Sequence, residues 1–360
     1  MESQIDIQNV LDYCKISIQN VLDNAMKVTL KDIARESGYS ITTVSHALSG
    51  YGDVNEKTRQ HIIAIAERLG YQPNLAARHL RSKQTKTIGM VIPLTTYYSD
   101  PFFMELLSGV GRQAAEYGYD LLLSAQQPGE EELNAYRRIV ASSRIDGVVV
   151  ARVQRDDPRI DFLKEARHPF VVFGRSNAND YPYIDVDGRA GVRQIVLHLA
   201  RLGHRRIAFI LSPPQLAFTS LRYEGYCQGL EEAGLALSEA YVVEGDLTRA
   251  SGYAAALRLL DLPEPPTAIV ACNDSMAIGA MLAIQERRLM VGRDIAVAGF
   301  DDIPAAATAN PPLTTVRQPI YDIGRQALDM LIRVIRREPV EEHVLIVPEL
   351  IVRASTGGMV

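Results

Sequence analysis

The stretch SGYSITTVSHALSG, residues 37–50, holds six Ser or Thr residues, one histidine and no acidic residue. Ile41, Val44 and Leu48 recur every three or four positions, which is the spacing of the apolar face of a helix. We therefore predict a short helix over residues 41–48. Its apolar face should be buried, and its outer face should be polar without being charged.

Two further helices are expected on either side of this one. Thr29 can cap a helix over residues 30–37 that Gly38 ends, and Ser40 can cap the helix over residues 41–48. A third helix should begin near Asn55 and carry five apolar residues before Gly70, namely Ile62, Ile63, Ile65, Ala66 and Leu69. Three helices in so short a segment, with three or four residues between the first two, have helix-turn-helix spacing.

In a helix-turn-helix, the second helix enters the major groove of DNA, where short polar side chains meet base edges and phosphates. The outer face of the predicted second helix offers Ser40, Thr42, Thr43, Ser45 and His46. An ordinary surface helix in a small bundle is the alternative, but it normally carries more Lys and Glu. The pattern therefore favours DNA binding and leaves the alternative open.

The distribution of charge supports a polyanion partner for this part of the chain. The 360 residues carry a net charge of -5, yet residues 27–86 hold ten Lys or Arg against five Asp or Glu, a local +5. The remaining 300 residues therefore sum to -10. A basic module on an acidic body is typical of a nucleic-acid-binding head joined to a second functional unit. A chance excess of basic residues on a solvated face is the other interpretation.

Composition excludes several classes of protein. Charged residues make up 22% and hydrophobic residues 47%, as in ordinary globular proteins. The three cysteines, Cys14, Cys227 and Cys272, form no CxxC pair, which disfavours a disulfide scaffold or a zinc site and suits the cytoplasm. No apolar run approaches the length of a membrane span, and the N-terminus lacks the features of a secretory signal. We therefore expect a cytoplasmic protein of two or three units with no membrane partner.

From residue 87 onward, apolar strands alternate with longer helices, a pattern that predicts parallel sheets flanked by helices. Eight such units fit either one barrel or two doubly wound lobes. We favour two lobes because residues 183–188 and 313–319 resemble connections that cross from one lobe to the other. The predicted strands cover residues 88–92, 120–124, 147–151, 170–173, 207–211, 241–243, 268–272 and 295–299.

Motifs of enzymes fail in this context. Gly109-Val110-Gly111 falls within a predicted helix rather than after a strand, so it is no dinucleotide loop. No GxxxxGK[ST] or HExxH sequence occurs, and the histidines are scattered. Asp185 and Asp187 suit turn and helix-cap chemistry better than an acid–base pair. We expect no catalytic residues, no metal and no cofactor.

Several ordered motifs resemble those of the LacI/GalR family of bacterial repressors, from about Lys27 to the C-terminus. In the head these are VTLKDIA (28–34), GYSITTVSH (38–46) and LGYQPNLAARHL (69–80). Later motifs are IDG (145–147), LGHRRI (202–207), CNDSMAIG (272–279), GFDD (299–302) and PLTTV (312–316). The resemblance implies a three-helix helix-turn-helix head followed by two doubly wound parallel-sheet lobes of the type I periplasmic-binding-protein kind.

The resemblance also implies which residues contact DNA. Ile41, Thr42 and His46 occupy base-reading positions, and six residues lie near phosphates: Thr29, Ser40, Thr43, Ser45, Tyr71 and Asn74. Residues 74–80, including Ala77, are expected to fold into a hinge helix on the operator. Leu80 then inserts into the minor groove, and Arg81 adds a neighbouring contact. His46 stands where many members have arginine, so a contact from one nitrogen replaces a bidentate contact to guanine.

Ligands of such two-lobed proteins sit between the lobes at the carboxyl ends of strands. The candidates there are Phe102, Phe103, Arg175, Tyr183, Arg222, Asn273 and Asp301. Arg222, Asn273 and Asp301 match the family positions best, whereas Phe102 and Phe103 suit a helix core equally well. Leu247 departs from the family, which often has an aromatic ring there.

These expectations divide the chain into an N-terminal extension (1–26), a DNA-binding domain (27–73), a hinge and linker (74–86) and a core for ligand binding and dimerisation (87–360). The extension carries a near-repeat, residues 5–12 and 16–23, and has no assigned role. The implied function is a homodimeric regulator, a repressor of a near-palindromic operator, controlled by a mono- or oligosaccharide. Two alternatives stay open: a purine as the effector, and a sugar-binding protein without a DNA-binding role.

Overall fold

Three short helices near the N-terminus pack around a small apolar core. The structure, a computed structural model, describes residues 28–49, 51–71, 84–93, 101–176 and 180–357. The helices are α2 (Leu30–Ser37), α3 (Ile41–Ser49) and α4 (Glu56–Arg68). Ile33, Val44 and Ile62, one from each helix, are fully buried against one another. The three predicted helices are thus confirmed.

Capping groups explain where these helices begin and end. Gly38 has a φ of 72°, the left-handed conformation that ends α2 cheaply only at glycine. The Asn55 Oδ1 accepts a hydrogen bond from the Thr58 amide at 2.9 Å and so caps α4. The tight turn between α2 and α3 is therefore set by local chemistry.

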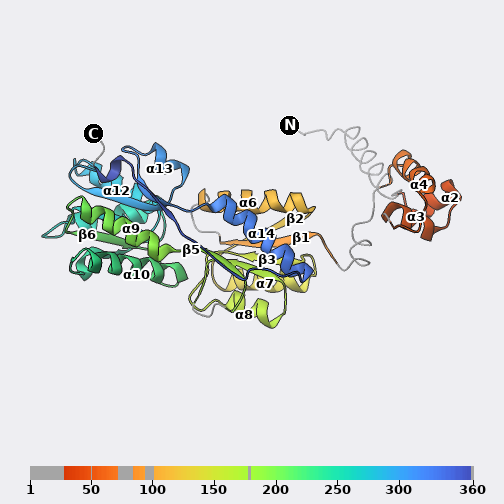
Figure 1. Ribbon diagram of the computed structural model, residues 1–360, viewed down its shortest axis with the longest axis horizontal. Helices are drawn as coiled ribbons and strands as arrows, with labels where there is room; N and C mark the ends of the chain where they lie inside the picture. The colour runs from red at the N-terminus through yellow and green to blue at the C-terminus, as the bar shows by residue number, and fades with distance from the viewer. Residues whose placement is uncertain (1–27, 50, 72–83, 94–100, 177–179, 358–360) are drawn as a thin grey trace, which may run out of the picture. The chain divides into compact units, whose positions relative to one another are not determined.

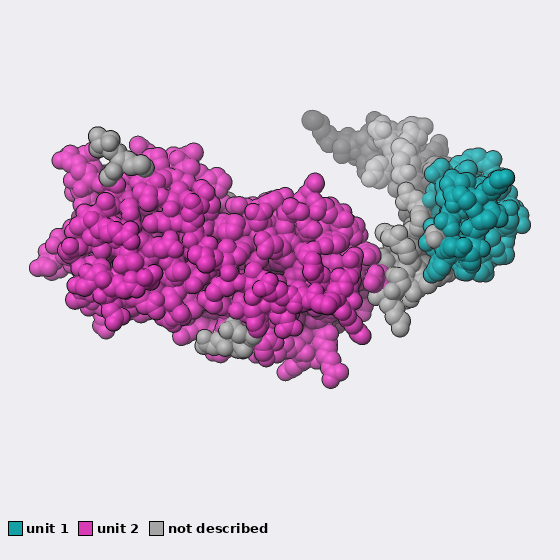
Figure 2. Space-filling view, in the orientation of Figure 1, with its two compact units in different colours: residues 1–83 teal, residues 84–360 magenta. Residues whose placement is uncertain are grey.

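The chain divides into two compact units, residues 1–83 and 84–360, which Figure 2 shows in two colours. The second unit consists of two lobes, each built on a six-stranded sheet (Figure 1). The prediction of two doubly wound lobes rather than a barrel is confirmed.

The sheet of the first lobe has the order β11-β5-β4-β3-β1-β2 and is parallel throughout. Helices α6 and α14 cover one face and α7 and α8 the other, so that the sheet is buried between two apolar clusters. The elements are β1 (Thr87–Pro93), α6 (Pro101–Tyr117), β2 (Asp120–Gln126), α7 (Glu130–Ala141), β3 (Gly147–Val150), α8 (Pro158–Glu165), β4 (Phe170–Phe173), β5 (Tyr183–Val186), α14 (Ile320–Arg336) and β11 (His343–Ile346).

The sheet of the second lobe has the order β12-β10-β9-β8-β6-β7, with only β12 antiparallel to its neighbour. Helix α9 packs on α10, and α11 packs on α12. The elements are α9 (Gly188–Arg201), β6 (Ile207–Leu211), α10 (Ala217–Glu232), β7 (Val242–Glu244), α11 (Arg249–Leu260), β8 (Ala268–Ala271), α12 (Asp274–Glu286), β9 (Ala296–Asp301), α13 (Pro304–Thr308), β10 (Thr314–Arg317) and β12 (Glu349–Ile351). Short 3₁₀ turns cover Glu239–Tyr241 and Ala354–Thr356.

The chain crosses between the lobes three times. The first crossing follows β5, the second follows β10, and the third lies between β11 and β12. The first two were predicted, although residues 183–186 and 314–317 form strands before the chain crosses. The third, at residues 347–348, was not predicted. Both lobes therefore contain segments from distant parts of the sequence.

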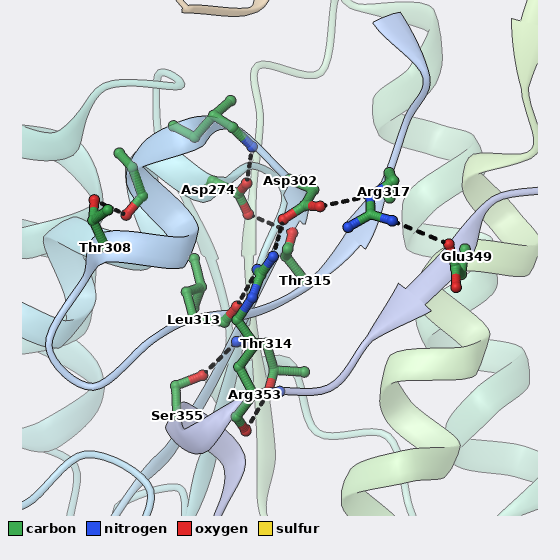
Figure 3. Close-up of polar contacts among 12 residues, drawn as sticks. Asp274, Asp302, Thr308, Leu313, Thr314, Thr315, Arg317, Glu349, Arg353 and Ser355 are labelled. Carbon is green, nitrogen blue, oxygen red and sulfur yellow. Dashed lines mark hydrogen bonds and ion pairs between the residues drawn. The ribbon is translucent and has the colours of Figure 1, made fainter.

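Polar contacts link the segments next to the second and third crossings. Arg317, at the end of β10, donates from Nε to Asp302 at 2.7 Å and lies 3.4 Å from a carboxylate oxygen of Glu349 on β12. Arg353 donates to the other Asp302 oxygen at 2.7 Å (Figure 3). One carboxylate, Asp302, thus holds the arginine just before the second crossing and the arginine shortly after the third.

Candidate DNA-reading face and ligand cleft

Helix α3 presents polar and apolar groups at its N-terminal end. The Ser40 Oγ accepts from the Thr43 amide at 3.0 Å, which caps the helix, and lies 2.9 Å from the Thr43 hydroxyl. Ile41 is 46% exposed and Thr42 is exposed beside it. The N-terminal end of α3 thus presents an accessible apolar side chain beside polar ones, at the place where a recognition helix meets base edges.

The other head residues that were predicted to bind DNA lie in varied surroundings. Thr29 donates to Asp32 from its amide at 3.0 Å and from its hydroxyl at 2.7 Å, so its side chain serves the start of α2. Ser45 was predicted on the outer face, but it is only 7% exposed, since it lies beside Val44 on the buried side of α3. Tyr71 is half-buried after α4. Asn74, Ala77, Leu80 and Arg81 fall outside the described residues.

His46 lies one helical turn beyond Thr42 and is held by two neighbours. Its Nδ1 is 2.5 Å from a carboxylate oxygen of Asp53. Its ring centroid is 4.8 Å from that of Tyr51. The imidazole is therefore fixed in orientation before any partner arrives.

A cleft opens between the two lobes, at the carboxyl ends of their strands. It encloses about 750 Å³, counting the part open to solvent, which is in the range for small-molecule sites. Both lobes contribute apolar side chains to it: Phe102, Val153 and Phe173 from the first, and Phe218, Leu221 and Leu247 from the second. Phe102 and Phe173 stack with ring centroids 5.5 Å apart and their planes nearly parallel, so that two aromatic rings line the first-lobe side of the cleft.

The first lobe places a carboxylate and an arginine in the cleft. Asp185 on β5 is 8% exposed, and one of its oxygens lies 3.1 Å from Nε of Arg175. Burial raises the pKa of Asp185 to about 6, although the charge of Arg175 opposes this shift. Asp187, 3.9 Å from Arg175, caps α9 by accepting from the Ala190 amide at 3.1 Å. The cap role predicted for Asp187 is thus confirmed, whereas Asp185 is a cleft residue.

The second lobe contributes Arg222 on α10 and Asp301 at the end of β9 to the cleft. The Arg222 guanidinium lies 3.7 Å from the ring centroid of Phe300 and 4.7 Å from that of Phe218, and it donates to the Cys272 carbonyl. Its NH2 is 3.7 Å from an Asp301 oxygen. These contacts fix the guanidinium in a buried, oriented position.

Asp301 adopts a strained backbone in order to reach the cleft. Its φ is 117°, a value that L residues other than glycine rarely adopt. Gln318 donates to its Oδ1 at 2.5 Å. Leu247, which also lines the cleft, has a φ of 72°. Such strain costs stability and clusters at binding sites.

Asn273 and Asp274 support the cleft from the start of α12. The Asn273 Oδ1 accepts from the Met276 amide at 2.9 Å, and its Nδ2 donates to the Leu247 carbonyl at 3.0 Å. Asp274 is fully buried, and burial together with the neighbouring Asp301 raises its pKa well above the ordinary value. Its oxygens accept from the Thr315 hydroxyl at 2.5 Å and the Ile303 amide at 2.9 Å.

The structure gathers Phe102, Arg175, Arg222, Asn273 and Asp301 around the cleft. It does not bring Phe103 or Tyr183 there. Phe103 is 5% exposed in the apolar cluster under α6, because the inward side of that helix meets the sheet. Tyr183 is 7% exposed and stacks on His343 of the neighbouring strand, with centroids 4.7 Å apart. The structure thus places both residues outside the lining of the cleft, among apolar core residues of the first lobe.

Several cleft residues were missed in the predictions from sequence, among them Asp185, Phe218 and Gln318. Position relative to a strand end could have revealed Gln318, which directly follows β10. Asp185 lies within a strand, where an isolated acidic residue in an apolar run is itself a signal of a polar site. Phe218 carries no such signal, because its place depends on how α10 meets the other lobe.

Backbone hydrogen bonds join the lobes beside the cleft. The Ala217 amide donates to the Val153 carbonyl at 2.9 Å, and the Arg155 amide donates to the Gln215 carbonyl at 3.0 Å. We call residues 153–155 and 215–217 the interlobe bridge. It brings the start of α10, with Phe218 and Arg222, over the first lobe.

A buried ionic cluster anchors the first-lobe side of this bridge. Arg159 is 2% exposed and donates to Asp157 from Nε at 2.9 Å and from NH2 at 2.6 Å. It also donates to Glu132 and, at 2.8 Å, to the Arg152 carbonyl. The Asp157 carboxylate in turn accepts from the Gln154 amide at 3.0 Å. The cluster thereby fixes the loop that carries Arg152 and Val153 into the cleft.

Two features are absent from the described part of the chain. None of its helices combines the length and apolar character needed to cross a membrane. No group of three His, Cys, Asp or Glu residues in that part is arranged to hold a metal ion.

A helix-turn-helix head and a two-lobed ligand cleft in one chain define a ligand-controlled transcriptional regulator. Comparison with known proteins agrees with this class. Residues 29–74 match the model of bacterial regulatory proteins of the lacI family, and residues 196–356 match the periplasmic binding protein-like domain. The chain belongs to the lacI family and is a DNA-binding transcriptional regulator.

Its relatives span nearly the whole chain. The HTH-type transcriptional regulator AglR of Rhizobium meliloti is 38% identical over 92% of this chain and 95% of its own length. The ribose operon repressor of Escherichia coli is 34% identical, over 91% and 99%. The structure of the lac repressor dimer bound to operator and an anti-inducer superposes with a TM-score of 0.83 at 28% identity, over 92% of this chain and all of that one. The CelR–cellobiose complex gives 0.71 at 32%, over 91% and all of that chain.

Proposed function

We propose that this chain is a repressor that binds a near-palindromic operator as a homodimer and responds to a sugar in the interlobe cleft. The observation that carries the proposal is the mixed lining of the cleft. The aromatic rings of Phe102 and Phe173, which line the cleft, suit contact with the apolar C–H surface of a pyranose. Carboxylates and arginines from both lobes suit its hydroxyls, which donate and accept at once.

Control by the sugar follows from where these polar groups lie. Asp185 and Arg175 belong to the first lobe, whereas Arg222 and Asp301 belong to the second. A sugar that bonds to both sets favours one angle between the lobes over others, and it shifts the population accordingly. The coupling is reciprocal, so operator DNA must change sugar affinity by the same factor as the sugar changes operator affinity.

The relatives support the remaining parts of this proposal. One of the structures just compared is a repressor dimer bound to operator, and another holds cellobiose. We assign this chain a role in the bacterial cytoplasm, at the nucleoid, and a dimeric state. The relatives named above are regulators rather than enzymes, and we propose no catalytic step for the cleft.

A thermal-shift screen tests the effector class. The purified full-length protein is screened against mono- and oligosaccharides and against purine bases, and calorimetry follows on any compound that raises the melting temperature. We expect a sugar to bind and the variants R222M and D301N to lose binding at least tenfold. The variant R193M is the control, because Arg193 pairs with Glu232 on the exposed surface. Binding of purines but not sugars overturns the sugar assignment.

A further inference from the structure

Asp53 is an acidic residue in a head built to meet a polyanion, and the structure gives it a specific contact. One of its oxygens lies 2.5 Å from Nδ1 of His46. The Asp53 side chain is 59% exposed and that of His46 is 33% exposed, so both are within reach of a partner. A carboxylate near DNA phosphates opposes binding, since it repels them. Its presence therefore calls for a compensating role.

The loop that carries Asp53 is anchored on both sides. Val54 is 9% exposed in the core of the head, and Asn55 caps α4. Arg59 of α4 reaches back and donates to the Tyr51 carbonyl at 2.6 Å. Asp53 is thus a fixed acceptor rather than a mobile side chain. The ring of Tyr51 adds a second wall against the imidazole.

A carboxylate only accepts hydrogen bonds, so the Nδ1 of His46 must carry the proton in this contact. Its ring is then unable to flip, and Nε2 is the one nitrogen free to meet a base. A histidine without such a neighbour can offer either nitrogen in two ring orientations, which broadens the range of base edges that it accepts.

We propose that Asp53 is a positioning residue: it lowers the affinity of the head for DNA in general, and by orienting His46 it increases the preference of His46 for one base over the others. The proposal rests on the proposed function, in which α3 reads the operator. Asp53 acts through the histidine and need not touch the DNA. It reduces binding to all sequences through its charge and narrows the choice at the one base pair that faces His46.

The test begins with the full-length protein and a library of randomised duplex DNA, which defines a selected duplex. Affinities are then measured for every single-position variant of that duplex. H46A identifies the base pair that His46 reads, as the position where the preference disappears. The variants compared at that position are D53A, which removes both the acceptor and the charge, and D53N, which keeps an acceptor and removes the charge. E67A, on the exposed side of α4, controls for the loss of a negative charge elsewhere in the head.

In the wild type we expect a preference of about tenfold at the His46 position, the usual scale for one base pair. D53A should reduce it to about twofold while binding unselected DNA as tightly as the wild type or more tightly. D53N should retain most of the preference, and E67A all of it. In the H46A background, D53A should change no base preference.

Three results overturn the inference. If D53A retains the tenfold preference, Asp53 acts through charge alone. If D53A weakens preference at every position together with the thermal stability of the head, its role is structural. If D53N loses the preference as fully as D53A, the retained acceptor does not matter. Failure of the library to yield any selected duplex overturns the proposed operator binding itself and is thereby distinct.

Discussion

Replacement of Arg159 by methionine should strongly destabilise the two-lobed core. The guanidinium is the only cation that the structure shows bonded to the buried carboxylates of Glu132 and Asp157, whose side chains are 3% and 1% exposed. Methionine fills similar volume but leaves both buried carboxylates without a positive partner, and only backbone amides such as that of Gln154 still donate to Asp157. Removal of one member of a buried ionic cluster costs about 3–5 kcal/mol. For a unit of this size, each kcal/mol lowers the melting temperature by about 2–4 °C, so a fall of roughly 10 °C is expected.

A matched control separates burial from the simple loss of an ion pair. Arg193 also makes a bidentate contact with a carboxylate, at 2.7 Å for both bonds to Glu232, but the two side chains are 39% and 45% exposed. Exposed pairs contribute little to stability, because solvent screens their charges. R193M should therefore lower the melting temperature by no more than about 3 °C. Scanning calorimetry of the two variants beside the wild type gives the comparison.

The pH dependence gives a second, independent readout. Burial pushes the pKa of Asp157 up, but hydrogen bonds and charge from Arg159 outweigh it and hold the pKa below its ordinary value. Burial already keeps the pKa of Glu132 raised. Without the guanidinium, burial should raise the pKa of both carboxyls, so we expect the variant to fold with uptake of protons. Its deficit should be greatest at pH 7 and should shrink towards pH 5. An equal deficit at both pH values, or one no larger than that of R193M, refutes the reasoning.

Three further predictions concern the cleft and the head. D185N should weaken the dependence of stability on pH, because the pKa of Asp185 is raised from 3.8 to about 6 in the folded protein and the wild type therefore loses stability as the pH rises from about 4 to 6. The difference between the melting temperatures at pH 4.5 and pH 7 should be smaller in the variant than in the wild type. In G188A, the new Cβ would lie 3.1 Å from Cγ of Arg222, so the Arg222 side chain must shift. Calorimetry should show sugar binding weakened severalfold with little change in melting temperature, and unchanged binding would count against a role for Arg222. I62A truncates a fully buried side chain at a cost of about 2–5 kcal/mol, which is enough to unfold so small a head. The variant should lose operator binding in a mobility-shift assay and keep sugar binding in calorimetry.

The parts of the fold that could be predicted are those with strong local signals. Helices α2, α3 and α4 could be predicted from their caps and from the spacing of their apolar residues. Strands such as Ile207–Leu211 could be predicted because both of their faces are buried, which makes them continuous apolar runs. The strands at the crossings lack this signal. β5 carries Asp185, and β10 begins with two threonines that bond to neighbouring segments rather than packing as apolar residues.

The cleft residues also divide into those that the sequence signals locally and those that depend on packing. Arg222 and Asp301 could be placed there from family motifs, and Arg175 from its position after a strand. Sequence could not decide between Phe102 and Phe103, since adjacent residues on a helix point in different directions and only the packing of α6 selects one. Phe218 depends on the interlobe bridge, a contact between segments about 60 residues apart that no local pattern encodes.

The three crossings between the lobes also set the order in which a newly made chain can fold. The head and β1 to β5 leave the ribosome early, but the first lobe still lacks α14 and β11, which complete its core and the edge of its sheet beside β5. Between Val186 and Ile346 lie 160 residues, which take about 8–32 s to synthesise at 5–20 residues per second. During that interval the exposed edge of β5 and the uncovered face of the sheet are open to chaperones or to aggregation. A premature stop close to the C-terminus therefore damages the lobe that is encoded first.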